Sequence, residues 1–184
     1  MSFENVVEQI LAVTARYDKK VLAETTLNRM IRRISGLARY PQNLYEVSQA
    51  NSNSEAVVSI DLPERFQALS YVRTSSCREN LGIISMQKSK TTDPGYYITG
   101  SRLLIRVPAI EDTILIGWYI HPSSLVNPID TNWILSTFEH VLVDMVSAAM
   151  QGMLGNADAW RTLETYSAQF LEAEHQNSSH PYGD

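Results

Sequence analysis

Residues 96–151, YYITGSRLLIRVPAIEDTILIGWYIHPSSLVNPIDTNWILSTFEHVLVDMVSAAMQ, decide the fold because they join strands to one long apolar helix. In the first half, apolar residues alternate with smaller or more polar neighbours. They are Ile98, Leu103, Ile105 and Val107, followed by Ile114, Ile116, Trp118 and Ile120. A period of two is typical of half-buried strands, so we predict strands here, with turns at Gly100-Ser101 and Glu111-Asp112.

The second half of this stretch predicts a helix. Pro122 and Pro128 cannot donate ladder hydrogen bonds, and residues 130–132 offer N-cap oxygens to a helix from Asn132 to about Leu154. Apolar side chains cover most of its circumference. The rest is a polar seam of Ser136, His140, Asp144, Ser147 and Gln151.

The length of this helix raises the possibility of a membrane span. Glu139, His140, Asp144 and Gln151 would then lie at hydrocarbon depth, where each charged group costs about 2 to 3 kcal/mol. We therefore reject a membrane span. A helix that is apolar on more than one side is a core helix, covered by its own chain or by a neighbouring subunit.

Outward from this stretch, the chain predicts helices at both ends and strands between them. A first helix runs from a Ser2 cap to near Tyr17, a break follows at 18–20, and a second helix spans about Thr25 to Ala38. Between Asn43 and His121 the predicted strands are LYEVS, AVVSIDLP, FQALSYVRT and LGIISMQ, in addition to those above. A polar loop precedes Tyr96, and a last helix carries Trp160.

These elements predict an α+β fold, in which the N- and C-terminal helices form a bundle beside a central antiparallel β-sandwich or barrel of about six strands. The predicted domains are 1–41 with 129–175 for the bundle, 42–128 for the β subdomain, and 176–184 for an extended tail.

Composition narrows the class of protein. A chain of 184 residues, 44% hydrophobic, can bury a full core. Its net charge of −5 argues against a dedicated nucleic-acid binder, while leaving room for local basic patches. The single cysteine excludes an internal disulfide, and the first ten residues lack the basic start of a secretion signal, so we expect a protein made in the cytoplasm.

Motifs that carry chemistry are missing from the sequence. There is no G-x-S-x-G, no G-x-x-x-x-G-K-[ST] and no G-x-G-x-x-G. The four histidines have no metal-ligand spacing, and Cys77 beside Arg78 is more simply read as an inert cysteine than as a nucleophile. We therefore expect no catalytic residues, no metal and no cofactor.

Several residues are candidates for binding surfaces. Arg29, Arg32 and Arg33 share one helix face, which we expect at a subunit interface, either solvated or paired with Glu24, Glu164 or Glu172 of this or the next subunit. Contact with phosphates is the alternative for this face. The loop lysines Lys88 and Lys90 could face DNA or a tail component in the same way. The aromatic residues Trp133, Phe138 and Trp160 are packing anchors or anchors at a subunit interface.

The order of segments resembles the head-to-tail adaptor family of tailed bacteriophages, which includes the tail tubular proteins of short-tailed phages. Four stretches carry the resemblance: Asp61 to Phe66 (DLPERF), Tyr97 to Pro108 (YITGSRLLIRVP), Ile114 to Leu125 (ILIGWYIHPSSL), and the closing helix pair from Asn132 to Phe170. Together they span nearly the whole chain. Tyr45 departs from the pattern, because the first strand of the family is expected to carry a tryptophan there.

The resemblance implies a structural virion protein in the neck between capsid and tail. It implies a homo-oligomeric ring, typically twelvefold, beneath the portal protein, with a tail or nozzle protein below and double-stranded DNA passing transiently through the channel. It also implies that the tail reaches the portal. The tail residues concerned are His175, Gln176, His180, Pro181, Tyr182 and Asp184.

Two other hypotheses stay open at this point. One is another neck protein, such as a head-completion, stopper or gatekeeper protein that closes the DNA channel. The other is a small enzyme whose site is assembled from scattered residues.

Overall fold

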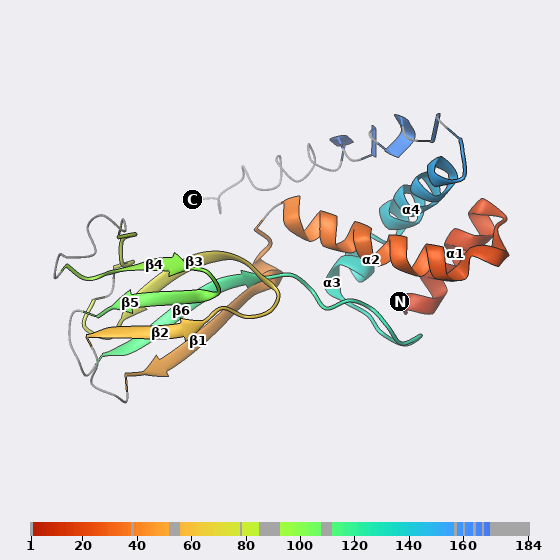
Figure 1. The fold of residues 1–184 in the computed structure, drawn as a ribbon. Coiled ribbons are helices and arrows are strands. Elements are labelled where there is room, and N and C mark those ends of the chain that lie inside the picture. The colour runs from red at the N-terminus through yellow and green to blue at the C-terminus, as the bar shows by residue number, and fades with distance from the viewer. Residues whose placement is uncertain are drawn as a thin grey trace, which may run out of the picture. The chain divides into compact units, whose positions relative to one another are not determined.

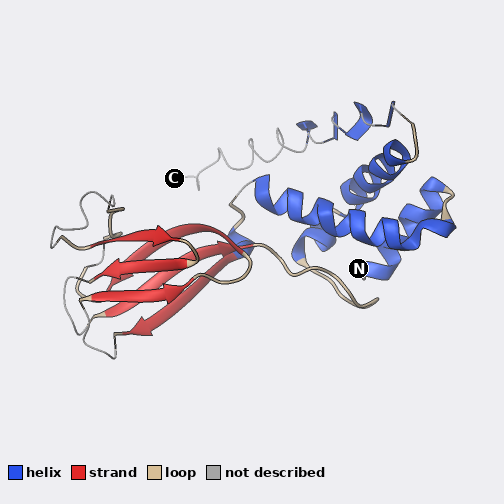
Figure 2. Ribbon diagram, viewed as in Figure 1, coloured by secondary structure: helices blue, strands red, loops and turns tan. Residues whose placement is uncertain are grey.

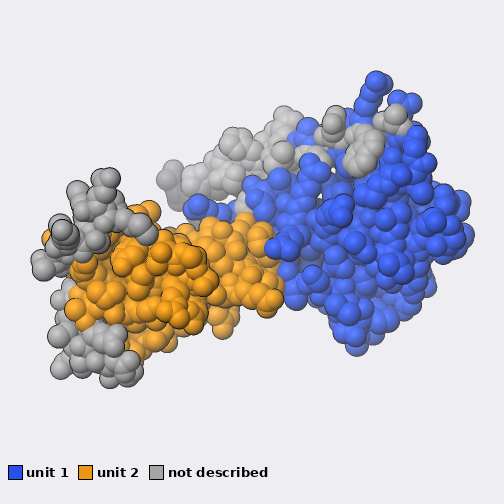
Figure 3. All heavy atoms as spheres, viewed as in Figure 1, with its two compact units in different colours: residues 1–39, 122–184 blue, residues 40–121 orange. Residues whose placement is uncertain are grey.

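The computed structural model describes residues 2–37, 39–51, 56–77, 79–84, 93–107 and 112–156, and most residues from 158 to 169 (Figure 1). The chain divides into two compact units, one of Met1–Arg39 with Pro122–Asp184 and one of Tyr40–His121 (Figure 3). Helices make up the first unit and strands dominate the second, which makes the protein α+β (Figure 2). The predicted packing of the bundle beside the sandwich stays a prediction.

The helical unit consists of α1 (Phe3–Thr14), a short 3-10 turn η1 (Tyr17–Lys19), α2 (Lys20–Leu37), α3 (Trp133–Thr137) and α4 (Glu139–Met153). The described residues from 158 to 169 are also helical. Helix α4 packs against both α1 and α2. Its buried residues face several directions, and they are Leu142, Val143, Met145, Val146, Ser147, Ala148, Ala149 and Met150.

The first helix ends earlier than the predicted end near Tyr17. The Ser2 side chain caps α1 by accepting a hydrogen bond from the Asn5 amide (3.5 Å). The helix then ends at Thr14 because Ala15 adopts a left-handed conformation (φ 51°), from which its N–H bonds back to the last turn. Helix α2 also starts earlier than predicted, at Lys20 and not at Thr25.

The predicted continuous helix from Asn132 to Leu154 is interrupted. Asn132 caps α3 as predicted, accepting a hydrogen bond from the Leu135 amide (2.9 Å), but Phe138 leaves helical geometry (φ −116°, ψ 28°). The Ser136 hydroxyl donates to the Asn132 carbonyl four residues earlier (3.1 Å), a bond that bends helices. The chain therefore turns between α3 and α4.

The β unit contains a short turn η2 (Pro41–Asn43) and six strands: β1 (Leu44–Ala50), β2 (Val57–Asp61), β3 (Phe66–Thr74), β4 (Gly95–Thr99), β5 (Arg102–Arg106) and β6 (Thr113–Ile120). They form two antiparallel three-stranded sheets, ordered β1-β6-β3 and β2-β5-β4, and not a single six-stranded barrel. One hydrophobic cluster draws on both sheets, with Val72 and Ile116 from one and Leu103 and Ile105 from the other.

The stretch LGIISMQ was predicted as a strand, and its described part is not one. Residues 81–84 carry only an isolated bridge between Ile83 and Tyr96. The Leu81 amide bonds the Val72 carbonyl (2.8 Å), and the Ile84 amide bonds the Tyr96 carbonyl (2.8 Å). This segment therefore connects the β3 edge of one sheet with the β4 edge of the other.

Candidate interaction surfaces

The structure brings together two of the three aromatic residues predicted at a subunit interface. Trp133 and Phe138 flank α3, and their rings meet edge to face with centroids 6.1 Å apart. Both side chains are half-buried, so each keeps an exposed part. Trp160 lies outside the described residues.

The arginine face, by which we mean Arg29, Arg32 and Arg33, is exposed on α2. Residues three and four positions away on a helix are neighbours, and at those spacings from these three arginines the sequence has no Asp or Glu. Arg29 instead neighbours Arg32 and Arg33. Like-charge neighbours of this kind each cost an exposed helix about 0.2 to 0.5 kcal/mol.

Other cations of the described chain have partners. Arg16 and Lys19 pair with Asp18, and Lys20 pairs with Glu4. Two further ion pairs are Arg102 with Asp61 and Arg161 with Asp158. Arg65 donates a hydrogen bond to the His121 carbonyl, and Arg73 donates one to the Asn80 side chain. Arg106 also has an interaction partner. Within the described ranges, the arginine face and Arg39 just after α2 are the cations without an ion pair or hydrogen bond.

The outer face of the β1-β6-β3 sheet carries a cross-strand contact that the sequence analysis missed. The Tyr71 ring, from β3, lies directly over Gly117 in β6 and its hydroxyl reaches the Glu46 carboxylate in β1. That hydrogen bond, with burial as a smaller cause, raises the pKa of Tyr71. The Arg73 guanidinium stacks on the same ring, its carbon 4.8 Å from the ring centroid. Gly117 inside an otherwise apolar strand was the signal for this close approach.

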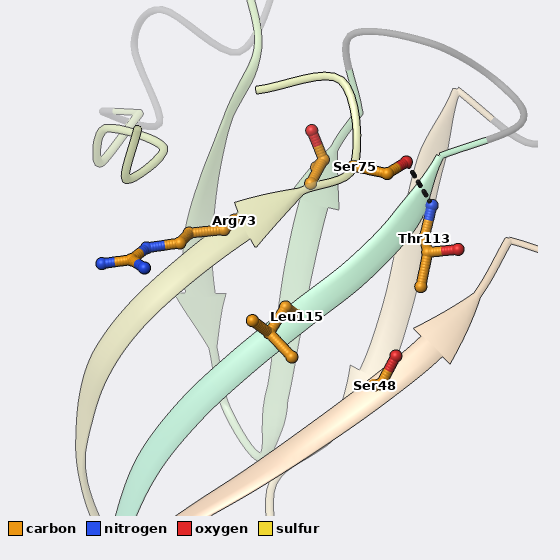
Figure 4. Close-up of a pocket in the computed structure, with 6 residues that line it drawn as sticks. Ser48, Arg73, Ser75, Thr113 and Leu115 are labelled. Atoms are coloured by element: carbon orange, nitrogen blue, oxygen red, sulfur yellow. Dashed lines mark hydrogen bonds between the residues drawn. The ribbon is translucent and has the colours of Figure 1, made fainter. Parts of the chain in front are cut away.

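Beside this contact, the sheet face is hollowed into an open groove of about 390 Å³. Its lining residues are Ser48, Arg73, Thr74, Ser75, Thr113 and Leu115 (Figure 4). Leu115 lies between Ser48 and Arg73 in the strand register, and the Thr113 amide donates to the Ser75 hydroxyl (3.0 Å). The groove thus combines hydroxyl groups and one guanidinium with the apolar side chain of Leu115.

The buried carboxylate of Asp112 serves a structural role at the end of this groove. It accepts hydrogen bonds from the Ser75 hydroxyl (2.9 Å), the Ser76 amide (2.9 Å) and the Ser76 hydroxyl (2.7 Å). These bonds hold the turn that follows β3. Among the described residues, the partner that these two serine hydroxyls share is therefore a carboxylate and not a histidine.

The same residues bear on metal binding, thiol chemistry and membrane insertion. The described residues contain no group of three or more His, Cys, Asp or Glu side chains that could hold a metal ion. Cys77 is half-buried, and its thiol approaches the Glu79 carbonyl (3.8 Å). None of the described helices is long and apolar enough to cross a membrane.

No family model and no curated protein matches this chain.

The polar seam of the predicted core helix lines a small cavity in the helical unit. Asp144, Ser147 and Gln151 of α4 contribute to a hollow of about 160 Å³, which Val13 of α1 and Tyr166 also line. The buried apolar side of α4 is covered within the same chain. Of the two alternatives left open by the sequence, coverage by the chain itself is therefore the one observed, and the apolar character of α4 does not call for a neighbouring subunit.

The loop before α3 is held in a defined shape and presents apolar side chains. The Asp130 carboxylate accepts hydrogen bonds from the Val126 and Asn127 amides (2.8 Å each), while Asn28 of α2 bonds the Leu125 backbone in both directions. Val126 and Ile129 are 76% and 84% exposed. The two amides lower the pKa of Asp130 below its usual 3.8.

The charge on Asp130 supports a prediction about the stability of this loop. Because the folded pKa of Asp130 is lowered, its contribution to stability is complete above the usual pKa and is lost as the pH falls through the folded value. At neutral pH, Asp130→Asn removes the charge, and we expect faster hydrogen exchange at the Val126 and Asn127 amides. The Leu135 amide, bonded to Asn132, is the internal control and should keep its rate. Unchanged exchange at all three amides would contradict the role of Asp130.

The remaining predicted site residues lie outside the described residues. They are Lys88 and Lys90 in the loop, and His175, Gln176, His180, Pro181, Tyr182 and Asp184 in the tail. Their predicted contacts with DNA, a tail component or the portal stay predictions.

Proposed function

We propose that the chain is a structural subunit of a phage virion, a head-to-tail adaptor that forms a ring beneath the portal and joins the capsid to the tail. The observation that carries the proposal is the order of the elements. Helices from both ends of the chain form one unit, and the strands between them form a second. This order accompanies the four stretches that resemble the adaptor family.

The described surfaces agree with a binding role. They offer an exposed apolar loop, a half-buried aromatic pair and an arginine face. Because α4 is covered by its own chain, contacts between ring subunits have to come from such surfaces. In this proposal Trp133, Phe138 and Trp160 contribute to the contact between neighbouring subunits.

Assembly with the portal tests this function. The purified chain is mixed with portal protein, and the mass of the complex is measured by light scattering and its shape by electron microscopy. We expect a closed ring of this chain on the portal, with double-stranded DNA able to pass through it. A chain that stays monomeric beside the portal would refute the adaptor, and a ring whose channel is closed would favour the stopper or gatekeeper alternative.

A truncation tests how the ring attaches. Deleting residues 176–184 is expected to abolish binding to the portal, because the resemblance assigns portal contact to the tail. A matched control replaces the same residues with a Gly/Ser sequence of equal length, which keeps the length and removes the side chains. Portal binding that survives both changes would discard the assignment of the tail while leaving the ring intact.

A further inference from the structure

Among the described residues, no interaction that stabilises the fold accounts for the arginine face. Glu164 and Glu172, which the sequence analysis offered as partners, lie outside the described residues. Arg29 has Arg32 and Arg33 as its helical neighbours, and like charges at these spacings repel each other. No basic residue lies in the last turn of α2, so none of the three compensates the negative end of the helix dipole. By contrast, three other arginines each form an ion pair with an aspartate: Arg16, Arg102 and Arg161.

The geometry of the face fits a row of anions. Arg29 lies one turn before Arg32 and Arg33 on one side of an 18-residue helix, and all three are exposed. A guanidinium presents its N–H donors in a planar fork that matches the oxygens of a phosphate. Nucleic-acid backbones supply phosphates at regular intervals, and contacts to them position a duplex without reading its sequence.

We propose that the arginine face binds the phosphate backbone of double-stranded DNA without sequence preference. The binding is local, because the chain as a whole carries a net charge of −5 and repels DNA elsewhere. Such a contact is salt-sensitive and easily released, which suits DNA that moves past the protein. The inference rests on the proposed function for the source of the DNA, whereas the binding itself is a property of the isolated chain.

A charge-matched pair of variants tests the proposal. The test variant is Arg29→Gln with Arg32→Gln and Arg33→Gln. The control variant is Arg16→Gln with Arg102→Gln and Arg161→Gln, which removes the same number of charges from ion-paired positions. Binding of a fluorescent duplex is measured by anisotropy between about 50 and 200 mM salt, on two unrelated DNA sequences.

Each phosphate contact contributes about −0.9 to the slope of log affinity against log salt. Three contacts therefore weaken wild-type binding about 40-fold over this salt range. We expect the control variant to keep that dependence and the test variant to lose it. Each single Arg→Gln change should reduce the slope by about 0.9, which keeps the test valid if the triple variant folds poorly.

The outcomes separate the possible roles of the face. Equal DNA binding by the two triple variants, or no binding by the wild type, overturns the proposal. If the test variant keeps its DNA affinity but no longer forms a ring on the portal, the face contacts a neighbouring subunit and the proposal is wrong. If the wild type binds DNA through the face but never forms a ring, the DNA site stands and the adaptor function fails.

Discussion

Leu142→Ala is expected to lower the free energy of unfolding of the helical unit by about 2 to 5 kcal/mol. Leu142 lies in α4 with none of its surface exposed, and α4 packs against both α1 and α2. Removing its branched end leaves a cavity that three helices would have to move together to fill. The loss is measured by denaturant unfolding of the isolated chain, followed by the helical circular-dichroism signal.

A control on the same helix separates packing from helix propensity. Met153 ends α4 and is 40% exposed, so Met153→Ala is expected to change the free energy of unfolding by about 1 kcal/mol or less. If Leu142→Ala has an equally small effect in the monomer, α4 is not packed within one chain. That result would restore the alternative in which a neighbouring subunit covers the helix.

Local signals in the sequence identified much of the fold. Alternating apolar residues indicated β5 and β6, because a period of two is imposed by the strand itself. The N-cap of α3 was located within residues 130–132, where Asn132 supplies it, because a capping side chain acts on an amide only a few residues away. The α+β class followed from the order of such segments, with helices at both ends of the chain.

Features that depend on tertiary packing or on single backbone angles were not predicted. The end of α1 depends on one left-handed residue, Ala15, which is neither glycine nor asparagine and so gives no sequence signal. The break at Phe138 lies inside a stretch whose apolar residues keep helical spacing, from Ile134 to Val141 and Leu142. The apolar and polar residues of a strand alternate in the same way in a two-sheet sandwich and in a single barrel. This alternation therefore could not decide between the two architectures.

For the candidate surfaces too, local sequence predicted some features and tertiary packing determined the others. Exposure of the arginine face followed from helical spacing, whereas its lack of partners among the described residues depended on where their acidic side chains lie. Tyr71 and Gly117 are 46 positions apart by their numbers, on paired strands whose register contains two irregularities. A contact of that kind is visible only once the register is known, although a glycine within a strand did indicate that something approaches closely.

Gly117→Ala is expected to destabilise the β unit by about 1 to 3 kcal/mol, although alanine is ordinarily tolerated in a strand. An added Cβ would collide with Cε1 of the Tyr71 ring and lie 2.7 Å from its Cζ. The ring has to leave the sheet face, which breaks its hydrogen bond to Glu46 and its stacking with Arg73. Thermal unfolding followed by the fluorescence of Trp118, which is buried in this unit, measures the loss.

Two further variants show whether the ring is the cause. Gly82→Ala in the same unit adds a Cβ with no atom within 4 Å, so it should leave stability nearly unchanged. In a Tyr71→Ala background the clash is absent, and Gly117→Ala should become neutral or stabilising by up to about 1 kcal/mol, because alanine restricts the unfolded chain more than glycine does. If Gly117→Ala costs as much without the tyrosine ring as with it, the strand requires glycine for its backbone, and Tyr71 does not determine the residue beneath it.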